Sequence, residues 1–425
     1  MRLPGIRVTP DGPRAACAAA LAVSVLLPAT VISQPATPTV LVVTEAHRRE
    51  LMKAVESMTT EALADVLRRA RAGDADAQVV AALSLFAGNG ISRDQSEAMQ
   101  WLRAAVERGH PIAQNSMGML YALGAEGLPR DAAIAVEWFR KAASHQYPQA
   151  ESNLGWCYFT GDGVALDPAE AVRLFRLAAD KGNASGQNRL GVAYALGKGV
   201  ARDDRAALTW YRKAADGGDL NAMRNLAQAY NYGTGVPRDY TQAATWYRKA
   251  AEAGDTSAQV DLAISYIKGE GVRKDKEEAE KWFRKASEQG DAIGSFYLGQ
   301  FYIEKRFLGH TDSVSVLTGR DKFDLAARQG YPVAAFKLGQ LYSSLLSPHP
   351  IGKDDRQACT WYLVASHLDR PGPWEERQPG PMQEMRRELP RRIDQVRKSL
   401  GAARYAECER AASAWMSAHA ADRAR

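Results

Sequence analysis

Apolar residues recur along this chain at the spacing of short amphipathic helices, and glycine-containing turns separate those helices. Between 148 and 160, Ala150, Leu154, Cys157 and Tyr158 fall on one side of a helix, at positions i, i+4, i+7 and i+8. A turn follows, and then a second helix that is rich in alanine and carries a tryptophan. Six or seven copies of this helix, turn, helix unit follow one another, which predicts an all-α protein.

The tryptophans mark a fixed period. The steps from Trp210 to Trp246 and from Trp246 to Trp282 are both 36 residues. The other marks are Trp101, Trp138 and Trp361, with Leu174 and Lys322 at the same place in two further copies. Such a period predicts a solenoid, because a single unit cannot bury its apolar face and must stack on its neighbour. We expect the tryptophans to lie in the core.

The turns share a pattern of two glycines and, four residues later, an aspartate. The glycines are Gly88/Gly90, Gly161/Gly163, Gly197/Gly199, Gly233/Gly235 and Gly269/Gly271. Glycine suits such a turn because it allows φ > 0 and a close backbone approach. The aspartates, expected to be N-caps of the second helices, are Asp94, Asp131, Asp167, Asp203, Asp239 and Asp275.

Two further features delimit the second helix. A capping box is expected where Glu97, Glu170, Gln242 and Glu278 follow the aspartate by three residues. The helix is expected to end before a glycine, at Gly109, Gly182, Gly218, Gly254, Gly290 or Gly330.

The pattern A-x-x-x-L-G-x-x-Y-x-x-G-x-G-V-x-x-D-x-x-x-A-x-x-W-[FY]-R-K-A-A resembles the Sel-1-like repeat, a branch of the tetratricopeptide superfamily with a slightly longer unit. The resemblance covers 73–368. It implies an α/α superhelical solenoid with a concave groove, used as a protein-binding scaffold and often found in secreted or envelope proteins. The resemblance names no partner.

The segments outside the repeats differ in composition. Residues 1–33 place three arginines before an apolar, alanine-rich run, which predicts a signal peptide cleaved near Gln34, with an uncleaved anchor as the alternative. Residues 34–72 are expected to form a Pro/Thr-rich linker and N-terminal capping helices, with one helix over 60–72. A Pro/Gly linker is expected at 369–381.

Residues 382–425 are expected to form C-terminal capping helices, over 382–389 and 391–419. The apolar face of the second comprises Val396, Leu400, Ala403, Cys408, Ala411 and Trp415. Two repeats carry irregular turns: 304–323 replaces a glycine turn with a long insert, and 345–355 expands another. Such inserts are as consistent with tolerated loops as with binding sites.

Net charge argues against a nucleic-acid partner. The chain carries +6 at pH 7, but residues 1–33 contribute +2 and 369–425 contribute +3, which leaves +1 on the whole array between them. A near-neutral array without a basic stripe is poorly suited to follow a phosphate backbone.

Three cysteines remain if residues 1–33 are removed. Cys157 lies on the buried stripe of a first helix and is expected to be a small core residue. Cys359 and Cys408 both lie in predicted helices, and export would place them in an oxidising compartment, so we predict a disulfide between them. The alternative is that both are free core thiols, because sequence does not show whether the two side chains face each other.

The sequence shows no catalytic motif with specific spacing: no G-x-S-x-G elbow, H-E-x-x-H, Walker loop or C-x-x-C. We therefore predict neither enzyme activity, nor a metal site, nor a cofactor. His110 and His145 lie at unit boundaries, where a surface position is expected and a metal role is not.

A binding surface is expected on the first helices, at positions two, six and nine of each unit, which align on one side. These positions, which we call the predicted binding face, are Gln149, Asn153 and Trp156; Ser185, Arg189 and Val192; Asn221, Asn225 and Gln228; Ser257, Asp261 and Ile264. In tetratricopeptide relatives, by the resemblance, matching positions clamp extended peptides. Amides can bind a peptide backbone whatever its sequence, and Trp156 would add an aromatic anchor. A solvated helix face is the alternative.

Together these features predict an exported, non-enzymatic scaffold that binds a protein or peptide, in the periplasm or outside a bacterial cell, with no membrane span once the signal peptide is removed. The alternatives from the resemblance are binding of a cell-wall (peptidoglycan) fragment, or a β-lactam or cell-wall hydrolase. The missing paired cysteines and the missing nucleophile–base pair argue against the hydrolase.

Overall fold

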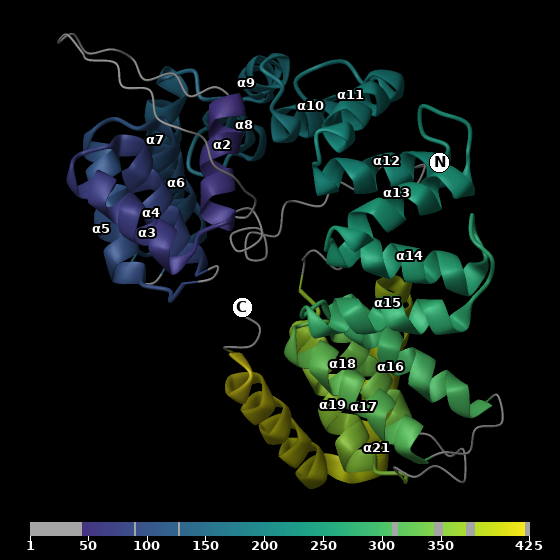
Figure 1. Cartoon of the computed structure of the whole chain (residues 1–425). Helices are drawn as coiled ribbons and strands as arrows, with labels where there is room; N and C mark the ends of the chain where they lie inside the picture. Colours follow the sequence, from purple (N-terminus) through teal and green to yellow (C-terminus); the bar gives the residue numbers. More distant parts are fainter. Residues whose placement is uncertain are drawn as a thin grey trace. The chain divides into compact units, whose positions relative to one another are not determined.

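The computed structural model describes residues 45–88, 91–125, 128–307, 313–343, 352–370 and 379–420. The predicted signal peptide, residues 34–44, Gly90 and most of the predicted linker at 369–381 lie outside the described residues. The described chain consists of consecutive helices joined by short turns, so the predicted all-α solenoid of helix-turn-helix units is confirmed (Figure 1). None of the described helices is long and apolar enough to cross a bilayer.

The described residues divide into two compact units, and the division falls inside α12 (Leu220–Tyr232). The N-terminal unit runs to Ala222 and includes Thr234–Val236. Its helices are α2 (Glu45–Glu56), α3 (Thr60–Arg71), α4 (Ala75–Ala87), α5 (Gln95–Glu107), α6 (Pro111–Leu123), α7 (Ala132–Ser144), α8 (Pro148–Thr160), α9 (Pro168–Asp180), α10 (Ala184–Leu196) and α11 (Asp204–Asp216).

The C-terminal unit holds the rest of α12 and all later helices. They are α13 (Tyr240–Glu252), α14 (Thr256–Lys268), α15 (Lys276–Glu288), α16 (Ala292–Phe307), α17 (Ser313–Arg328), α18 (Pro332–Ser343), α19 (Asp355–Leu368) and α21 (Pro379–Ala418). Each even-numbered helix from α4 to α18 is the first helix of a repeat, and the helix after it is the second.

In every repeat but the first, the core is built on the aromatic residue that follows the tryptophan position; in the first repeat Leu102 takes its place. Phe175 and Tyr211 are fully buried, and a Cβ added to Gly155 or Gly191 would lie 2.8 Å from the respective ring. The glycine of the L-G pair therefore leaves room for the ring against the first helix. The prediction that the tryptophan row is core is wrong except at Trp246, which is 9 % exposed.

The remaining tryptophans of the row are half-buried at the rim of the core: Trp101, Trp138, Trp210, Trp282 and Trp361. A lysine three residues later covers the ring in several repeats. The Lys249 ammonium lies 4.0 Å from the Trp246 ring centre, and that of Lys141 lies 4.2 Å from the Trp138 ring centre. Ring and lysine stem thus shield each other from water, with a cation–π attraction between them.

The turn glycines have the conformation that the sequence predicts. The first glycine is left-handed at the C-cap, as at Gly161 (φ +77°). The second packs on the preceding repeat: Gly199 also has φ +77°, and a Cβ there would lie 2.0 Å from the carbonyl oxygen of Pro168. In the same way, a Cβ added to Gly271 would lie 1.8 Å from the carbonyl oxygen of Tyr240. Glycine is required here both by φ and by contact between two backbones.

The predicted aspartate N-caps are confirmed in all six units; Asp203, for example, accepts hydrogen bonds from the backbone N–H groups of Arg205 and Ala206. The predicted capping boxes are wrong. In a capping box, the backbone N–H of Asp94 would donate to the Glu97 side chain. It donates instead to the Leu85 carbonyl, 3.2 Å away, and the backbone N–H groups of the other five aspartates likewise donate to a carbonyl of the preceding first helix. This bond ties the turn to both helices and leaves Glu97 to accept from the Trp101 indole.

The predicted ends of the second helices are also confirmed, since the six glycines named for this role all have positive φ. Gln146 holds the equivalent position after α7 and adopts φ +57°, although it is not glycine. A side chain in this region is strained by the clash of Cβ with the following carbonyl.

The predicted long insert at 304–323 is wrong over most of its length. Helix α16 continues to Phe307, α17 begins at Ser313, and residues 308–312 lie outside the described part. Both helices have 16 residues, so the extra sequence lengthens the repeat's helices. Of the expanded turn at 345–355, residues 345–351 lie outside the described part, and Asp354 caps α19.

A helix outside the repeats packs on each end of the array. At the N-terminal end, α3 packs on α4 and is held by a hydrogen bond from Gln78 Nε2 to the Ala70 carbonyl, 3.1 Å. At the C-terminal end, α21 packs on α19, whose Leu363 and Val364 are buried where four other second helices carry arginine and lysine.

The predicted shape of the C-terminal cap needs correction. The chain remains helical through Pro390 and breaks instead at Gly401 (φ 74°, ψ 168°). The break rotates the following turns, so Tyr405, Cys408 and Ala412 are buried. Ala403 and Ala411, predicted to be on the apolar face, are exposed.

Candidate functional site

Asn153 on α8 is the centre of a polar ladder that joins three first helices. Its Nδ2 donates to Asn115 Oδ1 on α6 at 2.9 Å, and its Oδ1 accepts from Arg189 Nη1 on α10 at 3.0 Å. Asn153 itself is buried. The amide that we predicted to face a ligand therefore holds neighbouring repeats together, because a buried amide must satisfy its donors and acceptors within the protein.

Arg189 and Trp156 form the more open part of the predicted binding face. Both are half-buried, and the Arg189 guanidinium carbon lies 5.4 Å from the Trp156 ring centre. Arg189 Nη1 also donates to Ser152 Oγ at 2.9 Å. Trp156 stacks on Phe159, with ring centres 5.5 Å apart. The two side chains are thus held in a fixed orientation, with part of each in contact with solvent.

Cys157 lies beside this pair and is buried, as expected for a core residue. Burial raises the pKa of its thiol to about 11, while the nearby charge of Arg189 acts in the opposite direction. The thiol stays protonated at neutral pH and is therefore a poor nucleophile.

Position two of the first helices forms a second ladder, to the N-cap of the next first helix. Gln149 Oε1 accepts from Asn183 Nδ2 at 3.0 Å, and Ser185 Oγ donates to Asp219 Oδ2 at 3.4 Å. Asn183 at the same time caps α10 by accepting from the Gly186 N–H at 2.8 Å. Gln149 and Ser185 therefore also contribute to the contact between repeats.

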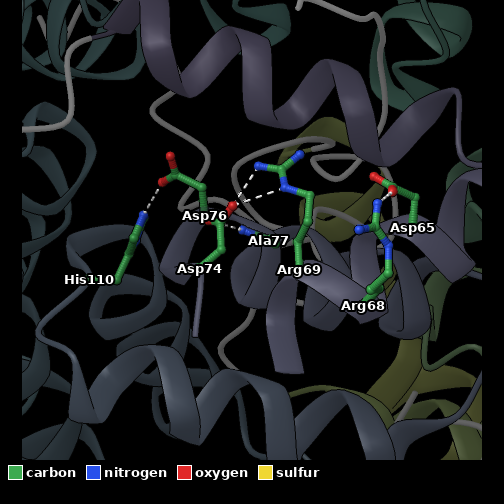
Figure 2. Close-up of polar contacts among 7 residues, drawn as sticks. All are labelled: Asp65, Arg68, Arg69, Asp74, Asp76, Ala77 and His110. Carbon is green, nitrogen blue, oxygen red and sulfur yellow. Dashed lines mark hydrogen bonds and ion pairs between the residues drawn. The ribbon is translucent and has the colours of Figure 1, made fainter. Parts of the chain in front are cut away.

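His110 makes the same contact in the first repeat boundary (Figure 2). Its Nδ1 accepts from the Ile112 N–H at 3.2 Å and caps α6, so its Nε2 carries the proton and donates to Asp76 Oδ1 at 2.8 Å. His110 is fully buried, so the predicted surface position is wrong. The expectation failed because histidine is not a usual N-cap residue; most other repeats place Asp or Asn at this cap, and two place tyrosine.

The surroundings of this histidine are ordinary cap and ion-pair contacts. Asp74 caps α4 through the Ala77 N–H and pairs with Arg69 at 2.6 Å, and Arg68 pairs with Asp65 (Figure 2). Within the described part of the chain, no group of three His, Cys, Asp or Glu side chains is placed to hold a metal ion.

The other residues of the predicted binding face fall into two classes of exposure. Asn225, Gln228 and Val192 are buried within the first helices. Asn221, Ser257, Asp261 and Ile264 are half-buried. The solvent-accessible side chains of the predicted binding face are therefore separated by buried ones along the repeats.

Cys359 on α19 and Cys408 on α21 are both free and buried, so the predicted disulfide is not formed in this structure. The predicted meeting of the two helices is confirmed, since α21 packs on α19. Burial raises the pKa of the Cys359 thiol, and Cys408 raises it further. Cys408 Sγ donates to the Arg404 carbonyl at 3.3 Å.

Comparison with known families identifies seven copies of one repeat. The Sel1 repeat model matches residues 75–110, 111–147, 148–183, 184–219, 220–255, 256–291 and 332–369. These boundaries agree with the pairs of helices from α4 to α15 and with α18 and α19. No protein with a curated description matches the chain.

Several solved structures resemble the chain. One is a protective antigen present in uropathogenic Escherichia coli strains that displays an SLR fold, with 34 % identity over 84 % of this chain and 71 % of that one, and a TM-score of 0.53. A Sel1 repeat protein from Oxalobacter formigenes is 28 % identical over 61 % of this chain and 97 % of its own, with a TM-score of 0.48.

Proposed function

The chain belongs to the Sel1 repeat family, and on that premise we propose that it is an exported, non-enzymatic scaffold that holds a protein partner in the groove of its first helices. Solenoids of Sel1 repeats typically serve as scaffolds for protein interaction. The observation that carries the proposal is the pair formed by Trp156 and Arg189, which is oriented by its neighbours and partly open to solvent.

Trp156 and Arg189 have the chemistry of an interface anchor. Tryptophan and arginine are the residues that contribute most often to binding energy at protein interfaces, because each offers a large apolar surface with a polar edge. The ladder through Asn153 fixes the helices that carry them. A partner would therefore bind a surface that is already ordered, and would lose little entropy in ordering it.

The test is capture of partners by the mature protein, followed by mass spectrometry. The wild-type chain is compared with Trp156→Ala and with Leu166→Ala, which removes an apolar side chain that is 57 % exposed and lies outside the predicted binding face. We expect Trp156→Ala to lose the partner, by tenfold or more in affinity, and Leu166→Ala to retain it. Equal retention by both variants would contradict the groove as the binding site.

Export into the bacterial envelope is a separate part of the proposal. It is supported by the three arginines and the alanine-rich apolar run of residues 1–33. N-terminal sequencing of protein recovered from the periplasm or the medium is expected to begin near Gln34. An intact N-terminus in the membrane fraction would refute cleavage.

A further inference from the structure

Helix α4 is enclosed on every side. All nine residues from Ala77 to Leu85 are buried. A helix that is buried all round needs a neighbour on each face. Helices α3 and α5 cover two faces, and α2 packs against another.

The buried apolar residues of α2 share one cluster with the α4 positions that correspond to the predicted binding face. Leu51 and Val55 on α2, and Met58 in the turn that follows it, are buried in the same apolar cluster as Val80 and Leu83. Val80 and Leu83 are positions six and nine of the first repeat, the places held by Asn153 and Trp156 on α8. The binding face is therefore apolar and covered at α4, and polar and partly open further along the N-terminal unit.

Helix α2 is not one half of an ordinary repeat. Helix α3 behaves as a second helix, because its Ala70 carbonyl accepts from Gln78, as the Ala179 carbonyl accepts from Gln187 at a later boundary. A first helix packs mainly on the second helix that follows it, but the main contact of α2 is with α4. Leu51 and Val55 on α2, with Met58 in the turn after it, are spaced i, i+4 and i+7, which is the anchor spacing of an amphipathic segment bound in a groove.

We propose that this face of α4 is a docking site for an amphipathic helix, that α2 occupies it within the chain, and that the partner presents a helix of the same apolar spacing and displaces α2. The second half of this inference rests on the proposed function, since it assumes a protein partner. Because α2 is joined to α3 by a short turn, it competes at a high effective concentration, and a partner helix binds more tightly once α2 is removed from the face.

The probe is a fluorescent, isotopically labelled peptide of residues 45–59, titrated into the full chain. Val55→Asp in the chain places a charge in the apolar contact and frees the face. We expect this variant to bind the peptide at least tenfold more tightly than the wild-type chain. Lys53→Asp changes an exposed residue of the same helix and should leave the affinity at the wild-type value. A peptide carrying Val55→Asp should bind neither chain.

Hydrogen exchange of the wild-type chain gives a second readout. At saturating peptide, the amides of α2 should exchange faster, while those of α4 and α8 stay protected. The proposal is overturned if the peptide fails to bind the Val55→Asp chain, or if it binds the wild-type chain without deprotecting α2. It is also overturned if Val55→Asp unfolds α4 and α5, since α2 would then be a structural cap. None of these outcomes bears on binding at Trp156, which the capture experiment tests separately.

Discussion

Alanine substitutions at two glycines of neighbouring turns would separate the energetic cost of a left-handed backbone from the cost of a clash between repeats. Gly182 and Gly199 have φ of +78° and +77°. A Cβ at Gly182 meets nothing within 4 Å, whereas a Cβ at Gly199 would lie 2.0 Å from the Pro168 carbonyl oxygen. Gly182→Ala therefore adds only conformational strain, and Gly199→Ala adds the same strain together with a clash between repeats.

The expected costs follow from these distances. An alanine in the left-handed region costs about 1–2 kcal/mol, part of which is offset by the lower entropy of the unfolded chain, so Gly182→Ala should destabilise by about 1 kcal/mol. At Gly199 the neighbouring backbone would have to retreat by more than 1 Å to reach ordinary contact distance. Overpacking of this kind adds about 1–3 kcal/mol, which brings Gly199→Ala to about 2–4 kcal/mol.

Urea unfolding gives the total cost, and native-state hydrogen exchange locates it. Contacts in a solenoid are between neighbours, so protection should fall most in α9 and α10 for Gly199→Ala and remain near wild type in α4 and α5. If the two variants lost the same stability, the contact with Pro168 would carry no energy. The argument that the second glycine is required by packing would then fail.

Three further outcomes are expected. Gln146→Gly should stabilise the chain by about 1 kcal/mol in urea unfolding because it removes strain at φ +57°, while Gln146→Ala, which keeps Cβ, should not; equal values would refute the strain. Trp246→Ala should cost about 3–5 kcal/mol and lower hydrogen-exchange protection in α13 to α15; unchanged protection would show that Trp246 is not core. Burial raises the pKa of the Cys157 thiol from 9.0 to about 11, so the stability that the protonated thiol contributes is complete below pH 9.0 and is lost as the pH rises toward 11. The free energy of unfolding should therefore fall less between pH 9 and 11 in Cys157→Ala than in the wild-type chain. Parallel curves for the two proteins would refute the pKa shift.

The repeating parts of the fold could be predicted because each rests on a residue whose backbone role is specific. Asp203 and its counterparts are N-caps, and the turn glycines adopt positive φ. These roles are local, so the sequence of one unit is sufficient to assign them. The same holds for the stacking itself, since the period of 36 residues is visible without knowledge of any contact.

The failures lie where a partner residue from elsewhere decides the outcome. Glu97 could form a capping box, but the N–H it would accept is taken by the Leu85 carbonyl. Trp138 and its neighbour Phe139 are equally apolar, and only the position of Gly118 on the first helix shows which ring is buried. Asn153 lies on the expected face, yet Asn115 and Arg189, about one repeat away on either side, use its hydrogen bonds.

The burial of Leu363 and Val364 fixes where the array stops. Four earlier second helices carry arginine and lysine at these places, as in Arg284 and Lys285, and none of the earlier second helices pairs two aliphatic residues there. Duplication or loss of a repeat within 75–291 would join equivalent surfaces and change only the length of the protein. A copy inserted after α19 would have to replace α21 and would face two adjacent aliphatic side chains, a pair that no earlier second helix presents at these places. Growth of such a gene by unequal exchange is therefore expected in its interior, and an insertion after α19 would also require changes at Leu363 and Val364.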